Sequence, residues 1–453
     1  MTSWRFGLGL ALGFLVAASV RAAEEAERGP NIVFIMADDL GYGDLGCYGQ
    51  EVIRTPRLDG MAREGTRFTQ CYAGSTVCAP SRSVLMTGQH TGHTTVRGNT
   101  GIGGVQGLGG AKGRVPLRAD DVTVAEVLKA AGYVTGMTGK WGLGEPGTSG
   151  EPNAQGFDEW FGFLNQRRAH NHYPDYLWRN REKVPLPGNA DGREGTYAHD
   201  LCTDFALDFI RRHKDRRFFL YVPWTPPHDK YQMPPQDHGY GRMDWKPNEI
   251  SHAAMVTRID RDAGRILDLL DELGLAEETI VFFCSDNGAA RRWEGRFDSS
   301  GPLRGRKRDL TEGGLRTPMI VRWKGSVPAG KTCDVPWWFA DVLPTCADLA
   351  GVEAPDGIDG ISVVETLTAC DPSTFEGRHF YWEFHERGAG QAVRWKHWKA
   401  IRAKGGQGVE LYDLAKDPAE ANDLAARHGD IVRKLRALMS SSRRESKEWP
   451  GQF

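Results

Sequence analysis

Short apolar runs without a helical period recur along most of the chain. They occupy residues 31–36, 133–137, 218–222, 279–284 and 319–323. Runs of this length, rich in β-branched and aromatic residues, are typical of strands buried on both faces of a sheet. Amphipathic stretches at 199–212 and 252–273 predict helices between them. This alternation predicts an α/β fold whose large sheet is mixed, mostly parallel and flanked by helices.

The pattern changes toward the C-terminus. Residues 145–200 are loop-like, and 325–375 carry turns and prolines that indicate a bridge. Three short antiparallel strands and a closing helix are then predicted at 379–384, 393–401, 408–412 and 430–439. We therefore expect one large domain with its bridge over residues 23–375, and a small C-terminal α+β subdomain with an antiparallel sheet over 376–453.

A signal peptide is predicted at residues 1–22. Arg5 supplies a weakly positive start, Phe6 to Val16 is apolar, and Val20 to Ala22 resembles a cleavage site. The apolar run is shorter than the roughly 20 residues that a membrane span needs. We expect an exported protein, periplasmic or secreted, with no stable membrane insertion.

Composition and cysteine usage narrow the functional classes. The formal net charge of −2 argues against a general binder of nucleic acid or of acidic membranes. The 56 glycines, many of them in the loop 97–115, indicate tight turns and loops that approach a ligand. Export permits disulfides, but the eight cysteines show no metal-binding spacing, and no disulfide is assigned from the sequence.

Polar residues that carry chemistry follow four of the predicted strands. They are Asp38 and Asp39, Lys140, His228, and the pair Asp286 and Asn287. In open α/β sheets, ligands bind beyond the carboxyl ends of the strands. One polar turn would be unremarkable, but four of them predict a site.

Asp38, Asp39, Asp286 and Asn287 offer only oxygen ligands. Such a set favours a hard cation, Ca²⁺ or Mg²⁺, over zinc. The alternative for Asp38 and Asp39 is an ordinary acidic turn. A zinc site would need clustered histidines, and we interpret His90 and His93 as ordinary surface residues.

Cys78 begins a segment, Cys78 to Gly88, that has the features of a short helix. Pro80 suits the first turn, and Gly88 suits the position after the last. A cysteine at a helix N-terminus is favourably placed for an anion, and its thiol pKa is lowered there. The residues alone leave two interpretations open: a buried structural cysteine, or a reactive nucleophile.

The sequence Cys-Ala-Pro-Ser-Arg, followed by Ser-Val-Leu-Met-Thr-Gly at 83–88, resembles the signature of the type I sulfatases. The resemblance implies an alkaline-phosphatase-like sandwich in which 23–375 is the catalytic sulfatase domain. It implies that a maturation enzyme oxidises Cys78 to formylglycine, and that the hydrated aldehyde attacks sulfur. It favours one Ca²⁺, with Mg²⁺ the weaker alternative, bound by the oxygen set and by the modified residue 78.

The same resemblance implies roles for cationic side chains. Arg82, Lys140, His228 and Lys307 match residues that hold the modified side chain and the sulfate oxygens. Lys307 is selected over the neighbouring arginines by a string that resembles the family's Gly-x-Lys followed by Glu-Gly-Gly. Asp286 would accept the proton of the nucleophile, and His228 or Lys307 would protonate the leaving oxygen.

One position departs from the family pattern. Sulfatases resembling this chain have His two residues after the lysine, whereas this chain has Gly142 after Lys140 and Trp141. That histidine is assigned to steer the nucleophile. We hypothesise that His170 or His172 replaces it from the loop 145–200.

These features predict a sulfuric ester hydrolase that acts on a sulfated carbohydrate or an aryl sulfate. The aromatic and basic residues of 145–200 favour an exo-acting enzyme on a sulfated polysaccharide. Two alternatives stay open: a phosphate-ester or phosphonate hydrolase of the same superfamily, and a non-catalytic homologue that binds sulfated glycans.

Overall fold

The computed structural model describes residues 29–106, 113–234, 239–386, 390–402 and 408–451. The signal peptide predicted at 1–22 lies outside these residues. Within the described part of the chain, no helix has the length and apolar character to cross a membrane.

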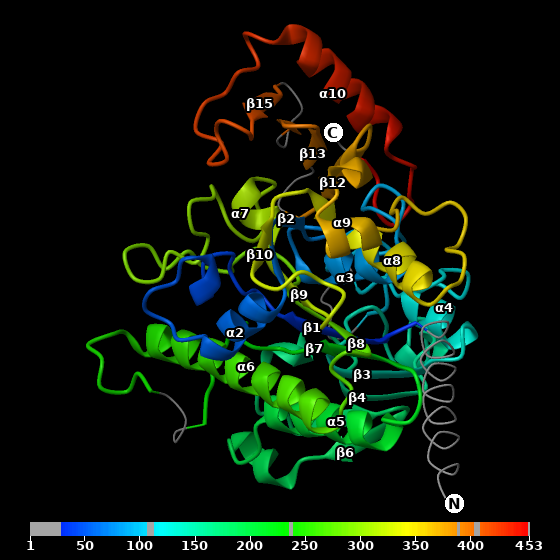
Figure 1. The fold of residues 1–453 in the computed structure, drawn as a ribbon, viewed down its shortest axis with the longest axis vertical. Coiled ribbons are helices and arrows are strands. Elements are labelled where there is room, and N and C mark those ends of the chain that lie inside the picture. The colour runs from blue at the N-terminus through cyan, green and yellow to red at the C-terminus, as the bar shows by residue number, and fades with distance from the viewer. Residues whose placement is uncertain (1–28, 107–112, 235–238, 387–389, 403–407, 452–453) are drawn as a thin grey trace, which may run out of the picture.

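An 11-stranded sheet forms the centre of the molecule (Figure 1). Its order is β10 (Lys331–Cys333), β2 (Thr66–Tyr72), β9 (Arg316–Arg322), β8 (Thr279–Ser285), β1 (Asn31–Ala37), β7 (Phe218–Pro223), β3 (Val134–Lys140), β4 (Glu159–Phe163), β5 (Tyr176–Arg179) and β6 (Glu182–Pro185), with β11 (Trp337–Trp338) paired to β2. The central strands β8, β1, β7, β3 and β4 are parallel, whereas β9, β5 and β6 join antiparallel. The predicted mixed, mostly parallel sheet is confirmed.

Helices cover both faces of this sheet. On one face lie α2 (Pro56–Glu64), α5 (Ala198–His213) and α6 (Pro247–Glu272), and on the other lie α3 (Cys78–Thr87), α4 (Val124–Ala130), α8 (Val342–Leu349) and α9 (Val364–Ala369). A hydrophobic core lies on each face of the sheet. The side chains of β1 point alternately into the two cores, so that Phe34 packs into one and Ile35 into the other. The predicted flanking helices are thereby confirmed.

A second sheet of four antiparallel strands lies at one end of the molecule, beneath α10 (Gly429–Ser441), at the top of Figure 1. Its strands are β12 (His379–Phe384), β13 (Gly390–Trp395), β14 (Trp398–Arg402) and β15 (Glu410–Asp413). Phe380 and Trp382 pack into the core beside the large sheet, whereas Tyr381 packs beneath α10. The alternation of β12 thus joins the second sheet to the first.

The structure corrects several predicted elements. The stretch 145–200 is not only loop, since it contains β4, β5 and β6. The single strand predicted at 393–401 is a hairpin that turns at Lys396, whose φ is 54°. The bridge 325–375 holds β10, β11, α8 and α9, and a disulfide joins Cys333 to Cys370 across it.

Candidate active site

The polar residues predicted to follow four strands lie at one edge of the sheet. Asp38 and Asp39 come directly after β1, and Asp286 follows β8. Lys140 ends β3, and His228 follows β7. Because β8, β1, β7 and β3 are neighbours in the sheet, their carboxyl ends bring these residues together.

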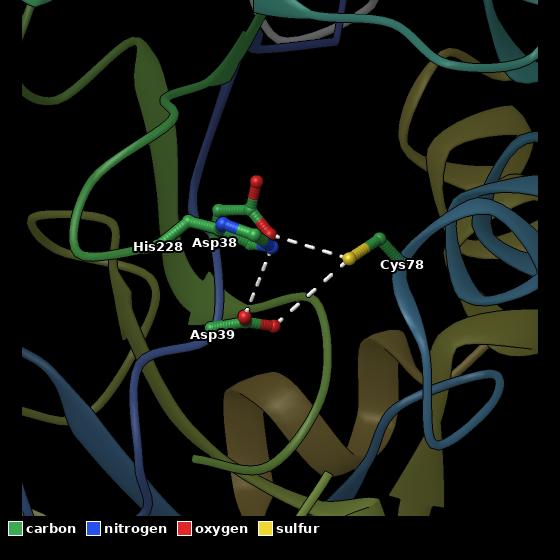
Figure 2. A group of neighbouring side chains, drawn as sticks. All are labelled: Asp38, Asp39, Cys78 and His228. Carbon is green, nitrogen blue, oxygen red and sulfur yellow. Dashed lines mark hydrogen bonds and ion pairs between the residues drawn. The ribbon is translucent and has the colours of Figure 1, made fainter. Parts of the chain in front are cut away.

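Cys78 reaches the same place from the other side. It is the first residue of α3, a helix whose ten residues are all buried. Gly88 ends the helix in the left-handed conformation, as expected, and its N–H donates to the carbonyl of Val84. Figure 2 shows the side chain of Cys78 pointing at two carboxylates, with Sγ 3.3 Å from Asp38 Oδ1 and 3.9 Å from Asp39 Oδ1.

Each of the three carboxylates contacts its own cationic side chain. Lys140 Nζ lies 2.6 Å from Asp38 Oδ2. Arg82 donates to Asp286 Oδ2 through Nε and Nη2, at 3.1 and 2.8 Å. Lys307 Nζ lies 2.6 and 2.7 Å from the two oxygens of Asp39, and 3.4 Å from Cys78 Sγ. All the cationic residues predicted for the site are therefore present in it.

His228 completes the cluster. Its Nε2 lies 3.2 Å from Asp39 Oδ2, as Figure 2 shows, and also 3.3 Å from Lys307 Nζ. Its Nδ1 lies 2.8 Å from Asp229 Oδ1. The ring of His170 stacks on the ring of His228, with 3.9 Å between centroids. His172 instead lies behind His228, because its Nε2 is 3.0 Å from the carbonyl oxygen of that residue.

The surroundings decide the protonation of these groups. Burial raises the pKa of the Cys78 thiol, and the nearby carboxylates of Asp286 and Asp38 raise it further. The ammonium groups of Lys140 and Lys307 lower this pKa, but by less. The expectation of a lowered thiol pKa at the helix N-terminus is therefore wrong. Burial favours neutral Asp38 too, but Lys140, His228 and Arg82 outweigh it and hold the pKa of this carboxyl well below its usual range. The site thus combines a protonated thiol with an ionised carboxylate.

The cluster contains atoms that could bind a metal ion. Atoms of Asp38, Asp39, Cys78 and His228 that can ligate metal all lie within 4.8 Å of one another. Asn287 donates through Nδ2 to Asp39 Oδ1 at 2.8 Å, and its own Oδ1 is buried with no hydrogen-bond partner among the described residues. An oxygen left over beside carboxylates is what a bound cation would use. Asp286 lies next to this group, but Arg82 and the N–H of Asp39 already contact its oxygens.

A cavity of about 720 Å³ lies between the segment after β8 and the second sheet, beside the site. Lys307 and Arg308 line it from the segment after β8, and Glu386 lines it from the segment after β12. This volume is in the range of pockets that bind small organic ligands. The cavity can therefore hold a molecule much larger than a sulfate ion.

The loop 145–200 contributes less to the site than its composition indicates. Trp160 is buried in the hydrophobic core, and Tyr176 and Trp178 lie on β5, where Lys183 covers their rings. Two of its histidines contact His228: His170 stacks its ring on the imidazole, and His172 contacts the backbone carbonyl.

His90 and His93 are not ordinary surface residues, contrary to expectation. Both contact the carboxylate of Asp359, and His90 is buried. Their rings stack on each other with 4.3 Å between centroids. This group lies outside the active-site cluster.

Sequence reasoning missed three residues beside Cys78. Asn99 Oδ1 accepts a hydrogen bond from the N–H of Ala79 at 3.2 Å. Gln166 Nε2 donates to the same oxygen, and Arg114 Nη1 donates to the carbonyl of Asn99. Each lies in a segment without periodicity, and the signal that could have pointed to one of them is the unusual Gly142, which Gln166 covers.

Most of the chain matches known proteins. The family model described as Sulfatase matches residues 30–352, and the model for the C-terminal part of N-sulphoglucosamine sulphohydrolase matches 306–445. Arylsulfatase A of Homo sapiens is 34% identical, covering 88% of this chain and 83% of its own length. N-acetylgalactosamine-6-sulfatase of Canis lupus familiaris is also 34% identical, covering 81% and 70%. The crystal structure of Ps i-CgsB with k-i-k-neocarrahexaose superposes with a TM-score of 0.80 at 27% identity, covering 92% of this chain and 93% of that one.

Proposed function

Because the chain belongs to the sulfatase family and is a sulfuric ester hydrolase, we propose that it acts through a formylglycine made from Cys78. The observation that carries this proposal is the placement of Cys78 Sγ between Asp38 Oδ1 at 3.3 Å and Lys307 Nζ at 3.4 Å. The raised pKa of the thiol argues against a thiolate nucleophile at this position. A formylglycine at residue 78, once hydrated, offers two hydroxyl groups on one carbon, one to attack sulfur and one to let sulfate depart.

Lys140 and Lys307 neutralise the negative charge of the sulfuryl oxygens, the largest electrostatic contribution that we expect. Both ammonium groups already lie within 2.7 Å of carboxylate oxygens, so they are held in place before substrate binds. Arg82 holds Asp286 through two N–H groups. Asp286 accepts the proton of the nucleophile.

His228 protonates the leaving oxygen. Asp229 contacts its Nδ1, and its Nε2 lies beside Lys307 and Asp39. His170 is the better candidate for the histidine missing at Gly142. Its ring stacks on His228, and its Nε2 is buried without a partner among the described residues. His172 is bound to Thr225 and to the backbone of His228, so it positions that segment.

One Ca²⁺, or less favourably Mg²⁺, would be held by Asp38, Asp39, Asp286, Asn287 and residue 78. The unpaired Oδ1 of Asn287 supports this assignment. Such a cation supplies positive charge to the sulfate group and to the oxygen of the modified residue.

The substrate that we propose is a sulfated carbohydrate or an aryl sulfate. The names of the relatives, arylsulfatase A and N-acetylgalactosamine-6-sulfatase, support these two classes. The cavity of about 720 Å³ supports a substrate with a large leaving group. We also propose export through the segment 1–22, and maturation by a formylglycine-generating enzyme.

The test uses protein expressed with and without a formylglycine-generating enzyme. Mass spectrometry of the peptide that contains residue 78 should show an aldehyde only in the first preparation. Turnover of 4-nitrophenyl sulfate should follow the aldehyde content, and 4-nitrophenyl phosphate should be hydrolysed more slowly.

Three results would contradict this proposal. Equal turnover by both preparations would exclude the aldehyde as the nucleophile. Faster hydrolysis of the phosphate would favour the phosphohydrolase alternative. A thiol that persists in the presence of the maturation enzyme, with sulfated glycans bound but not cleaved, would favour a binding protein.

A further inference from the structure

A buried glutamine fills the space beside Gly142. The parallel pairing of β3 with β4 continues past the strands, because Trp141 N–H donates to the carbonyl of Phe163 and Gly142 N–H to that of Leu164. The chain then brings Gln166 over Gly142, so that a Cβ at position 142 would lie 2.8 Å from Gln166 Oε1. Gly142 has a φ of +80°, which also favours glycine. The place of a side chain at 142 is therefore occupied by an amide.

Asn99 fixes the direction of this amide. The N–H of Ala79, next to Cys78, donates to Asn99 at 3.2 Å, and a backbone N–H can only face an acceptor. The contacted atom of Asn99 must therefore be Oδ1. The atom of Gln166 that contacts the same Oδ1 must be the donor Nε2. Consequently the other end of the Gln166 amide, Oε1, points elsewhere as a free acceptor.

This oxygen has no partner in the part of the chain that the structure describes. Gln166 is 2% exposed, and its Oε1 is buried without a hydrogen bond. A buried acceptor left unpaired costs about 1–3 kcal/mol, so such an atom indicates a missing donor. Asn99 links this amide to the N–H of Ala79, so the unpaired oxygen belongs to a hydrogen-bonded group that ends at the N-terminus of α3.

Arg114 provides the complementary group. Its Nη1 donates to the carbonyl of Asn99, and its Nε is buried without an acceptor among the described residues. Arg114 is 9% exposed, so this N–H is largely withdrawn from water. One free acceptor and one free donor therefore flank Asn99.

Asn99 also connects this pair to the cavity that Lys307 lines. The N–H of Asn99 donates to Glu386 Oε1 at 3.1 Å, and Glu386 lines the cavity together with Lys307. A sugar ring carries hydroxyl groups on neighbouring carbons, and each of them can donate and accept a hydrogen bond. A plain aryl group carries none.

We propose that Gln166 and Arg114 form a carbohydrate subsite beside Cys78. Gln166 Oε1 accepts a hydrogen bond from a hydroxyl group of the sulfated sugar, and Arg114 Nε donates to an oxygen of that sugar. The subsite rests on the proposed sulfatase function, and it narrows the substrate to a hydroxylated leaving group.

The test compares two substrates in the matured enzyme. The first is the best substrate in a panel of defined sulfated monosaccharides, and the second is 4-nitrophenyl sulfate, which has no hydroxyl group to donate. The measured quantity is the ratio of kcat/KM for the sugar to kcat/KM for the aryl sulfate. Gln166→Met, which keeps the length but removes the acceptor, should lower this ratio about tenfold, and Arg114→Met should lower it by a similar factor.

Gln155→Met is a matched control, because Gln155 is also a buried glutamine with an unpaired Oε1. Its Nε2 donates to the carbonyls of Arg118 and Ser149, away from the active-site cluster. This variant should lower the thermal midpoint without changing the ratio. Formylglycine content and thermal midpoint are measured for every variant.

Some outcomes would overturn the subsite alone. The first is an unchanged ratio in Gln166→Met, which is expected if water is the missing donor. The second is a wild-type enzyme that cleaves the aryl sulfate but no sugar in the panel. The absence of turnover on every sulfate ester, with formylglycine present, would instead overturn the proposed function.

Discussion

Two buried clusters of charged side chains differ in how completely the protein satisfies them. One is the active-site cluster of Asp38, Asp39, Arg82, Lys140, His228, Asp286 and Lys307. The other, here the inter-sheet network, lies between the two sheets and consists of Glu312, Arg316, Arg394, Lys399 and Glu420. All members of both are buried.

In the inter-sheet network the protein itself contacts every carboxylate oxygen. Glu312 Oε1 lies 2.8 Å from Lys399 Nζ, and its Oε2 accepts from Tyr72 and Arg316. Glu420 Oε1 lies 2.9 Å from the same lysine, and its Oε2 accepts from the N–H of Glu312. In the active-site cluster, by contrast, the neighbouring Asn287 Oδ1 is without a partner among the described residues. Burial of charge therefore marks both places, and each holds a buried oxygen without a hydrogen bond among the described residues. The difference is that Glu420 Oε1 faces the ammonium group of Lys399, whereas Asn287 Oδ1 belongs to a neutral amide beside carboxylates.

The two clusters are connected through one segment. Lys307 belongs to the first and Glu312 to the second, and the turn between them is pinned because Thr76 Oγ1 donates to the carbonyl of Asp309. The second sheet thus anchors the segment that carries an active-site lysine. This gives the second sheet a positioning role for Lys307.

Removal of Lys399 should have the largest effect on stability. Lys399→Met leaves Glu312 and Glu420 buried without their shared cation, and a broken buried pair costs about 3–5 kcal/mol. The free energy of unfolding, measured in urea, reports this loss. Lys416→Met is the control, because the Lys416 side chain is 85% exposed and lies 3.4 Å from Asp413, and an ion pair made by so exposed a lysine should contribute at most about 1 kcal/mol. Equal losses in the two variants would show that the network does not hold the sheets together.

Removal of Lys307 should affect activity more than stability. Lys307→Met should lower kcat for 4-nitrophenyl sulfate by about 10²–10³, because it deletes one donor that stabilises developing negative charge. Arg306→Met, an exposed neighbour in the same segment, should have a much smaller effect. A Lys307 variant that loses stability as much as Lys399→Met but keeps its turnover would reverse the contrast between the clusters.

The sequence predicted the strands that form the site because their pattern is local. The apolar runs before Asp38, His228 and Asp286 end where the polar residues begin, and parallel neighbours must then bring those residues to one edge. The short helix of Cys78 was predicted from Pro80 and Gly88 in the same way. Local pattern and strand order together account for most of the active-site cluster.

The features that the sequence could not predict depend on how loops run between the elements, and the pattern of apolar and polar residues does not specify those loops. Gln166 reaches Gly142 only because the β3–β4 pairing continues beyond both strands. The hairpin at Lys396 was missed because Trp395 and Trp398 keep the segment apolar through the turn. The pairing of Cys333 with Cys370 could not be selected from eight cysteines by spacing alone.

Removal of the cation should weaken the active-site cluster and leave the inter-sheet network unchanged. Treatment with EGTA should abolish turnover and lower the thermal midpoint, and Ca²⁺ should restore both. A cation present at a hundredfold excess over its Kd contributes about 2.7 kcal/mol of stability. Asn287→Leu should lose the Ca²⁺-dependent stabilisation, because it removes the unpaired oxygen, whereas Lys399→Met should retain it. A Ca²⁺-dependent midpoint that persists in Asn287→Leu would place the cation elsewhere.

The smallest effect that separates the clusters is the response of stability to acid. Burial alone would raise the pKa of Glu312, but Lys399 and Arg316 outweigh it and hold this pKa below its usual range. A carboxyl whose pKa is lower in the folded state stabilises the protein fully above its unfolded pKa, and this stabilisation is lost as the pH falls below about 4.3.

One such group changes the free energy of unfolding by at most about 1.4 kcal/mol per pH unit. Urea unfolding from pH 6 to pH 3, on protein stripped of the cation beforehand and transferred into metal-free buffer, should therefore show a steeper acid loss for wild type than for Glu312→Gln. Lys399→Met should flatten the slope as well, since it removes the partner that lowers the pKa, and an identical slope in all three proteins would mean that Glu312 does not titrate in this range.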